Sequence, residues 1–307
     1  MRKLIKNVNV FDGKNRELLE HHYIVIEDNL VAEISTGEIS EDNFDEVIDG
    51  RNQYAIPGLT DTHVHLGRIT DYQGHNNLEY SLVLTPRITA KLLAHGITTV
   101  RDAGGYVMAH LYTPECMKRA IKVGVKSLEH AHAMDDDTAR MIQAEDVFVT
   151  PMPQFTEEEI KWNHMGPYAD YVSYKKKKPG ANDVKSRTVY TTELINKYDL
   201  KILFGTDMMV TYPDYEPRQG LDFKEYKKRF GSYKGIVSAT GNVNDLIKLT
   251  TYQNPYPEGE IGVLKKGSFA DILVIQGNPV EDLELLYDVN NIQLIMKDGK
   301  VYKNTLS

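Results

Sequence analysis

Hydrophobic and polar residues alternate with a period of two at both ends of the chain. The pattern covers LIKNVNVFDG, HYIVIEDNLVAEIS, FADILVIQGN and IQLIMKDGKVYKN, with turn residues at Asp12-Gly13, Asp28-Asn29 and Asp298-Gly299. Such alternation is typical of half-buried strands, and Asp-Gly pairs favour tight hairpin turns. We therefore predict a small β-sandwich domain built from the two termini, residues 1–56 and 263–307.

The middle of the chain, residues 57–262, alternates short apolar strands with helical patterns. Six strands are predicted to end near His65, Asp102, His110, His130, Pro151 and Asp207. Helical patterns cover SLVLTPRITAKLLAHG, TPECMKRAIKVG, DDDTARMIQAED, TVYTTELINKYD and NVNDLIKLT. In the second of these, Thr113 is the expected N-cap, Pro114 the first helical residue and Gly124 the stop. Repeated strand–helix units predict an α/β fold with a parallel sheet or a (β/α) barrel.

Composition narrows the class of protein. The 307 residues carry a formal charge of -8, which argues against a nucleic-acid partner because phosphate binding requires a basic surface. Cys116 is the single cysteine, so no intrachain disulfide forms and a reducing compartment fits. The sequence shows neither a signal-peptide core nor an apolar run of membrane length. We expect a cytoplasmic protein without a membrane partner.

Five side chains with metal-binding chemistry lie at the ends of predicted strands. His63 and His65 are two residues apart, and residues at this spacing in a strand face the same side. His110, His130 and Asp207 each end another predicted strand. Histidines also occur at strand ends without any metal role, but the C-terminal ends of barrel strands meet at one mouth. Four imidazoles and one carboxylate there predict a site for Zn²⁺ or another divalent ion.

These segments resemble the amidohydrolase superfamily, specifically its imidazolonepropionase and prolidase-like (Xaa-Pro dipeptidase-like) branch. The resemblance rests on PGLTDTHVHL, GITTVRDAGG, YVMAHLYTP, AIKVGVKSLEHAHAMDDDTARMI, ILFGTD and YPEGEIGVLKKGSFADILVIQGNP. It implies a distorted (β/α)8 TIM-like barrel, a β domain from both termini, and a hydrolase with one or two metal ions. His63 and His65 resemble the ligands of the first strand, and His110 and His130 those of the fifth and sixth. Asp207 resembles the eighth-strand aspartate, which is both ligand and proton shuttle.

The chemistry implied is hydrolysis of an amide or cyclic amide. A divalent ion lowers the pKa of water and polarises the carbonyl, and Asp207 is the expected catalytic residue that transfers a proton to the leaving nitrogen. Arg101 is a candidate to bind a substrate carboxylate, with a structural ion pair as the alternative. Tyr112 is a candidate to hydrogen-bond the tetrahedral intermediate, by resemblance alone. Asp61 is expected either to orient a histidine ring or to serve as a strand-end residue.

The pattern departs from the family at one place. Only Gly104 and Gly105 separate the second-strand motif from the fifth-strand motif, whereas a parallel crossover requires about a dozen residues. The third and fourth strands, and the carboxylated lysine that bridges two metals in the binuclear branch, are therefore not found. Either the barrel is shortened, or residues are missing from this sequence between Gly105 and Tyr106. We favour the second explanation, because losing two strands would expose apolar edges.

Three functions remain open at this point. The leading one is a metal-dependent amidohydrolase acting on a small amide such as an Xaa-Pro dipeptide or an N-acyl amino acid. A mononuclear deaminase of the same superfamily ranks lower, because Thr113 occupies the place of that group's glutamate and the nearest glutamate is Glu115. The third is a non-catalytic relative with an incomplete site. The resemblance also suggests a homo-oligomer.

Overall fold

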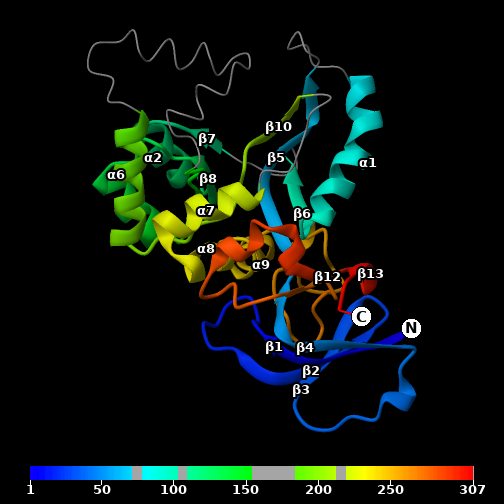
Figure 1. Cartoon of the computed structure of the whole chain (residues 1–307). Helices are drawn as coiled ribbons and strands as arrows, with labels where there is room; N and C mark the ends of the chain where they lie inside the picture. Colours follow the sequence, from blue (N-terminus) through cyan, green and yellow to red (C-terminus); the bar gives the residue numbers. More distant parts are fainter. Residues whose placement is uncertain (71–77, 103–108, 154–183, 212–218, 307) are drawn as a thin grey trace. The chain divides into compact units, whose positions relative to one another are not determined.

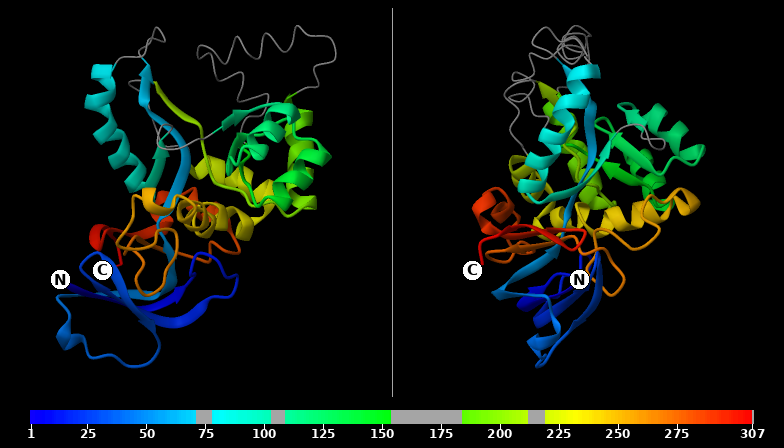
Figure 2. Two further views of the ribbon diagram at one scale, coloured as in Figure 1. Left: turned by 180° about the vertical axis from the view of Figure 1, so that it is seen from behind. Right: turned by 90° about the vertical axis from the view of Figure 1, so that its right-hand side faces the viewer.

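Strands from both ends of the chain form one sheet. The computed structural model describes residues 1–70, 78–102, 109–153, 184–211 and 219–306. Seven strands are hydrogen-bonded in the order β13-β12-β11-β4-β1-β2-β3. Figures 1 and 2 show the blue N-terminal strands beside the orange and red C-terminal ones. Their bounds are β1 Arg2–Val10, β2 Leu19–Glu27, β3 Leu30–Ser35, β4 Glu46–Pro57, β11 Ile272–Ile275, β12 Ile292–Lys297 and β13 Lys300–Asn304.

The predicted hairpins of this sheet are confirmed. β2 pairs with β3 and β12 pairs with β13, both antiparallel. Asp298 and Gly299 have φ values of 50° and 68°, the left-handed conformation that a two-residue hairpin turn requires. A shift of register between β1 and β4 falls at Lys6 to Val8, where Asn7 has a φ of 55°. Irregularities of this kind bend a sheet.

The sheet encloses its own hydrophobic core. Buried side chains of β1, β2, β3, β4, β11 and β12 form one cluster, which includes Ile5, Ile24 and Val274. The described residues contain one continuous seven-stranded sheet here, whereas the prediction was a sandwich. The strand order joins both termini in one sheet, and the sandwich arrangement stays a prediction. The predicted domain boundaries, 1–56 with 263–307 and 57–262, stay a prediction.

The middle of the chain supplies parallel strands. Two three-stranded sheets have the orders β10-β5-β6 and β7-β8-β9. Residues 201–207 bond to a strand of each sheet: the amide of Leu203 and the carbonyl of Lys201 bond Val149, and the carbonyl of Phe204 bonds Thr62. The strands are β5 Leu59–Thr70, β6 Ile97–Asp102, β7 Ala109–Leu111, β8 Ser127–His130, β9 Phe148–Thr150 and β10 Met208–Thr211.

These bonds give the order β6-β5-(201–207)-β9-β8-β7. The part of the chain that the structure describes contains no closed barrel, so the α/β class is established and the (β/α)8 barrel is not. The predicted break between Gly105 and Tyr106 lies outside the described residues.

The predicted strand LKILFGTD differs in detail. Of its residues only Ile202 forms a ladder bridge, to Val149, and the regular strand β10 begins at Met208. The reason is that the backbone changes partner within the segment. Leu203 still bonds β9, whereas Phe204 already bonds β5.

The five predicted helices are present among the described residues. In the part of the chain that the structure describes, the helices are α1 Leu78–Ala94, α2 Pro114–Lys122, α3 Asp136–Ala144, α6 Val184–Lys197, α7 Gln219–Phe230, α8 Ser232–Ser238 and α9 Gly241–Lys248, with 3-10 turns at Glu41–Asn43, Thr251–Gln253, Leu283–Leu286 and Val289–Asn291. Helix α2 begins as predicted: the Thr113 side chain accepts a hydrogen bond from the amide of Cys116, and Pro114 is the first helical residue. Gly124 ends it with a φ of 86°. Helices α7 and α8 were not predicted.

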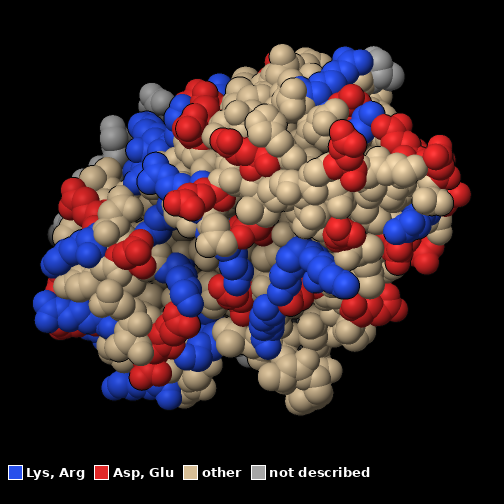
Figure 3. All heavy atoms as spheres, turned by 90° about the horizontal axis from the view of Figure 1, so that it is seen from below, with Lys and Arg blue, Asp and Glu red and all other residues tan. Residues whose placement is uncertain are grey.

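The chain divides into two compact units. One comprises residues 1–61, 89–100 and 217–307, and the other residues 62–88 and 101–216. All the candidate metal ligands belong to the second unit. Among the described residues, no helix has the length and apolar character needed to cross a membrane. Acidic and basic side chains are interspersed over the face shown in Figure 3.

Candidate metal centre

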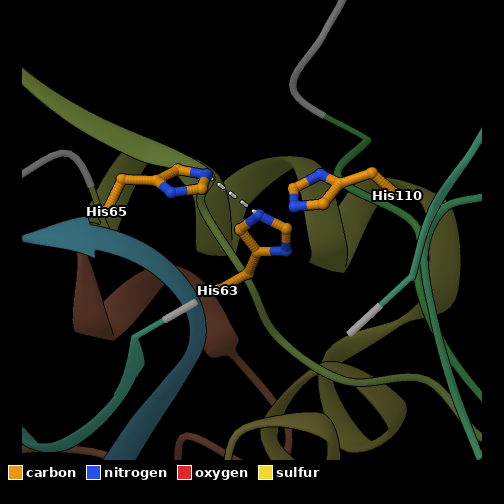
Figure 4. A group of neighbouring side chains, drawn as sticks. All are labelled: His63, His65 and His110. Atoms are coloured by element: carbon orange, nitrogen blue, oxygen red, sulfur yellow. Dashed lines mark hydrogen bonds between the residues drawn. The ribbon is translucent and has the colours of Figure 1, made fainter. Parts of the chain in front are cut away.

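Strand β5 places two imidazoles at one point. His63 and His65 face the same side because side chains alternate along a strand, and their Nε2 atoms lie 3.3 Å apart. His63 is fully buried and His65 is 7% exposed. In Figure 4 the rings of His63, His65 and His110 point toward one another from two different strands.

Strands β7 and β8 supply two more imidazoles. The strands are parallel and paired in register, with His110 opposite Glu129 and Leu111 opposite His130. Nδ1 of His110 lies 2.8 Å from Nε2 of His130. The His110 ring centroid is also 4.7 Å from that of His63. Pairing of two short strands therefore brings the fifth- and sixth-strand candidates to the histidines of β5.

Asp207 completes the group from the segment that precedes β10. Its amide donates to the carbonyl of His63, which fixes the backbone beside β5. One carboxylate oxygen, Oδ1, lies 2.9 Å from Nε2 of His65 and 3.3 Å from Nε2 of His63. Asp207 and His130 have φ values of 51° and 68°. Left-handed backbone is costly for such residues and is concentrated at functional sites.

The five donors fit a divalent cation. One donor atom from each of His63, His65 and His110 lies within 4.8 Å of the others, and the same holds for His63, His130 and Asp207. Imidazole nitrogens with one carboxylate oxygen are a donor set that zinc and similar ions prefer. The geometry brings all five predicted ligands together. Their roles as ligands, and that of Asp207 in catalysis, stay a prediction.

The pKa of His63 is shifted in the opposite direction from the pKa values of His110 and His130. Burial lowers the pKa of His110 and of His130, and the charge of His63 lowers both further, so their rings are neutral at pH 7. Burial also acts to lower the pKa of His63, but hydrogen bonds to Asp207 and Glu129 outweigh it and raise that pKa to about 9. A neutral imidazole is the form that binds a metal, so binding at His63 releases a proton.

The two carboxylates at the site are ionised. Burial acts to raise the pKa of Asp207, but hydrogen bonds from His63 and His65 hold it well below its usual range. For Glu129, burial is outweighed first by the charge of Arg101 and then by His63, so its pKa falls to about 2. Both groups therefore carry negative charge at neutral pH, as a cation site requires.

Glu129 was not predicted from the sequence. It is fully buried, and its Oε2 atom lies 2.9 Å from Nδ1 of His63. Its Oε1 atom accepts hydrogen bonds from Arg101 Nη2 and Ser127 Oγ, both at 2.7 Å. The available signal was a glutamate in an apolar strand directly before His130. Adjacent strand residues face opposite sides, however, so the pattern gave no reason to place both at one centre.

Arg101 and Asp61 each had two alternative roles in the prediction. Arg101 donates to Glu129, to Ser127 Oγ at 3.1 Å and to the carbonyl of Thr62 at 2.5 Å. The structure therefore shows the ion-pair alternative, and a substrate-binding role for Arg101 stays a prediction. Asp61 accepts a hydrogen bond from Gln219.

Tyr112 lies next to the candidate ligands, and its ring stacks on His130 with centroids 4.8 Å apart. Its predicted role toward substrate stays untested. Lys126, which directly precedes β8, donates a hydrogen bond to the carbonyl of Glu145.

Comparison with known proteins places the chain by fold. No family model matches it. A crystal structure of an amidohydrolase matches with a TM-score of 0.83 and 20% identity over 100% of both chains. A prolidase complexed with N-methylphosphonate-L-proline matches with a TM-score of 0.81 and 19% identity over 99% of this chain and 100% of that one. Ochratoxinase of A. niger matches with a TM-score of 0.76 and 16% identity over 99% of this chain and 96% of that one.

Curated relatives match over shorter segments. The 5-methylthioadenosine/S-adenosylhomocysteine deaminase of Dictyoglomus turgidum is 44% identical over 141 residues, 41% of this chain and 32% of that protein. The enzyme of the same name from Halalkalibacterium halodurans is 29% identical over 146 residues, 46% of this chain and 31% of that protein. The chain thus spans less than a third of these relatives. Its fold is that of the solved amidohydrolase and prolidase structures, and the predicted resemblance to the amidohydrolase superfamily is confirmed.

Proposed function

We propose that this protein is a metal-dependent hydrolase that cleaves a carbon–nitrogen bond of a small substrate. The observation that carries the proposal is that four imidazoles and one carboxylate from four separate segments meet at one place. They form two groups of three residues, and in each group the donor atoms lie within 4.8 Å of one another. Gathering this many metal-binding donors in one buried place is costly without an ion to bind them. A bound cation accounts for it.

His63, His65, His110, His130 and Asp207 would hold the ion, which we propose to be Zn²⁺ because imidazole donors predominate. Two overlapping triplets of donors leave room for one or two ions. A divalent ion in this place supplies Lewis-acid polarisation of a carbonyl and lowers the pKa of water. We also propose that the six parallel segments belong to a (β/α)8 barrel. A crystal structure that traces the chain between Asp102 and Ala109 tests this.

The protein's own groups supply the proton transfers. Asp207 is ionised, and one of its carboxylate oxygens, Oδ1, contacts the two histidines of β5. Asp207 can therefore accept a proton from water and pass it to the leaving nitrogen. Tyr112 stacks on His130 at the edge of the same group. From there its hydroxyl is the candidate to stabilise the oxyanion of the tetrahedral intermediate.

We propose an Xaa-Pro dipeptide or N-acyl amino acid as substrate. Support comes from the likeness to the prolidase over 99% of this chain. Deamination is the second candidate, because deaminases are the curated relatives with the higher local identity. The position that carries a glutamate in that group is Thr113, whose side chain caps helix α2. A threonine at that position, in place of the glutamate, favours the peptide or amide substrate.

Metal analysis and a substrate panel test the proposal together. The protein is freed of metal, reloaded with Zn²⁺, and assayed against Xaa-Pro dipeptides, N-acyl amino acids and adenine nucleosides. We expect bound zinc, and turnover of the first two classes that is lost on chelation. Ammonia release from the nucleosides alone would favour the deaminase. Bound zinc without any turnover would favour the non-catalytic relative.

A further inference from the structure

We propose that Glu129 is a positioning residue of the metal centre, an inference that rests on the proposed metal binding. By accepting a hydrogen bond from Nδ1 of His63, Glu129 fixes the ring so that Nε2 faces the ion. Arg101 and Ser127 in turn hold the Glu129 carboxylate. These three residues act through His63 and are not ligands themselves.

The geometry around His63 divides its two nitrogens between two tasks. Nδ1 lies 2.9 Å from Oε2 of Glu129. Nε2 lies 3.3 Å from both His65 Nε2 and Asp207 Oδ1, so it faces the other candidate ligands. A neutral imidazole carries one proton, and a carboxylate beside Nδ1 keeps that proton there. The lone pair is then left on Nε2, which is the nitrogen at the centre.

The second carboxylate oxygen shows that Glu129 is itself held in place. Arg101 and Ser127 both donate to Oε1 at 2.7 Å, which leaves Oε2 directed at His63. Arg101 is anchored in addition to the carbonyl of Thr62, the neighbour of His63 in β5. The chain of bonds therefore begins and ends on β5. A carboxylate behind a ligating histidine, fixed in this way, orients the ring and strengthens its binding.

His63 is the ligand for which such support matters most. It is the one residue shared by the two donor groups found among the described residues, so a rotated ring weakens both. Both His63 and Glu129 are fully buried. In the folded chain the partner of Nδ1 is therefore the carboxylate and not bulk water.

The experiment compares Co²⁺ binding by the full chain and by Glu129→Gln and Glu129→Leu. Affinity is measured by competition with a chromogenic chelator, and the visible absorption bands of the bound Co²⁺ report ligand geometry. We expect Glu129→Leu to bind Co²⁺ about 10–100-fold more weakly with shifted bands. Glu129→Gln, whose amide oxygen still accepts a hydrogen bond, should recover part of the affinity.

Asp271→Asn is the matched control. Asp271 is also buried and paired with a cation, Lys297 at 3.0 Å, but it belongs to the other compact unit. We expect this control to lose stability while its Co²⁺ affinity and absorption bands stay those of the parent. Folded Glu129 variants whose Co²⁺ affinity is within twofold of the parent's, with the same absorption bands, would overturn this inference but leave the proposed function standing. A parent chain that binds no Co²⁺ would overturn the proposed function as well.

A measurement on the unaltered chain covers the case in which the Glu129 variants do not fold. In the Zn²⁺-loaded protein, ¹⁵N–¹H correlation should show a proton on Nδ1 of His63, assigned by the loss of that signal in His63→Gln. A proton on Nε2 with Nδ1 bound to zinc would contradict the inference.

Discussion

Oδ1 of Asp207 lies 2.9 Å from Nε2 of His65, although these residues belong to segments far apart in the sequence. We predict that Asp207→Asn lowers kcat by about 10²–10⁴-fold, because a carboxamide cannot accept the proton of water. The four imidazoles remain, so zinc stays bound. Metal content and kcat check this. Asp146→Asn, an exposed aspartate of the same unit paired with Lys201, should keep full activity.

His63→Ala should weaken zinc binding more than His110→Ala does. The reason is that His63 contributes to both donor groups, whereas His110 contributes to one. We expect a loss of more than about 100-fold for His63→Ala, exceeding the effect of removing a supporting residue. Competition with a chromogenic chelator measures it, with His22→Ala in the terminal sheet as control. Equal losses for the two site variants would contradict the shared role of His63.

Arg101→Met should lower the stability of the fold rather than the affinity for substrate. Glu129 is fully buried, and removing Arg101 takes away the charge that does most to keep its carboxylate ionised, at a cost of about 3–5 kcal/mol in the free energy of unfolding. Urea denaturation measures this. Arg140→Met removes an exposed pair with Asp136 and should leave the free energy of unfolding nearly unchanged. A raised KM for carboxylate substrates at unchanged stability would instead support substrate binding by Arg101.

The compact unit that contains the seven-stranded sheet should lose stability in acid, because Glu260 becomes protonated. Burial acts to raise the pKa of Glu260, but its bonds with Lys248 and Lys265 outweigh it and lower the pKa to about 2 from 4.5. A lowered pKa stabilises the fold above pH 4.5, and this contribution disappears as the pH falls toward 2.

We therefore expect Glu260→Gln to reduce the free energy of unfolding by about 1–2 kcal/mol at pH 7, with the lysine pairs partly screened by water. The difference from the parent should shrink between pH 4.5 and 3. Urea denaturation at several pH values tests it, with the exposed Glu258→Gln as control. A difference that stays constant with pH would refute the assignment.

Gly299→Ala should destabilise the hairpin of β12 and β13. Gly299 has a φ of 68°, and a Cβ there would lie 1.9 Å from the carbonyl oxygen of Asp28. We expect a loss of about 2–4 kcal/mol in the free energy of unfolding, from backbone strain together with the clash. Gly37 also has a positive φ but no atom within 4 Å of its Cβ position. Gly37→Ala should therefore cost only about 1 kcal/mol, and thermal unfolding of both variants separates the two effects.

Local chemistry accounts for the elements that could be predicted. Helix α2 begins at Pro114 because Thr113 caps it, and both residues are adjacent in the chain. The hairpin at Asp298-Gly299 likewise follows from two neighbouring residues with a left-handed backbone. The five candidate ligands could be found because alternation and strand ends are patterns that a sequence displays.

Long-range contacts account for what could not be predicted. Residues 201–207 change partner from β9 to β5, a choice that depends on the distance between two strands and not on the residues themselves. The seven-stranded sheet likewise depends on pairing between strands far apart in sequence, such as β4 with β11.

The chain's own order of residues settles where helices start, where hairpins turn and which side chains stand at strand ends, because these depend on neighbours within a few positions. It does not settle that Glu129 supports His63 or that Arg101 is bonded to Glu129. Those contacts join β5, β6 and β8, and the left-handed backbone at His130 lets it serve the same centre as the adjacent Glu129. Such contacts arise only when the strands pack, since neither partner lies within local reach of the other along the chain.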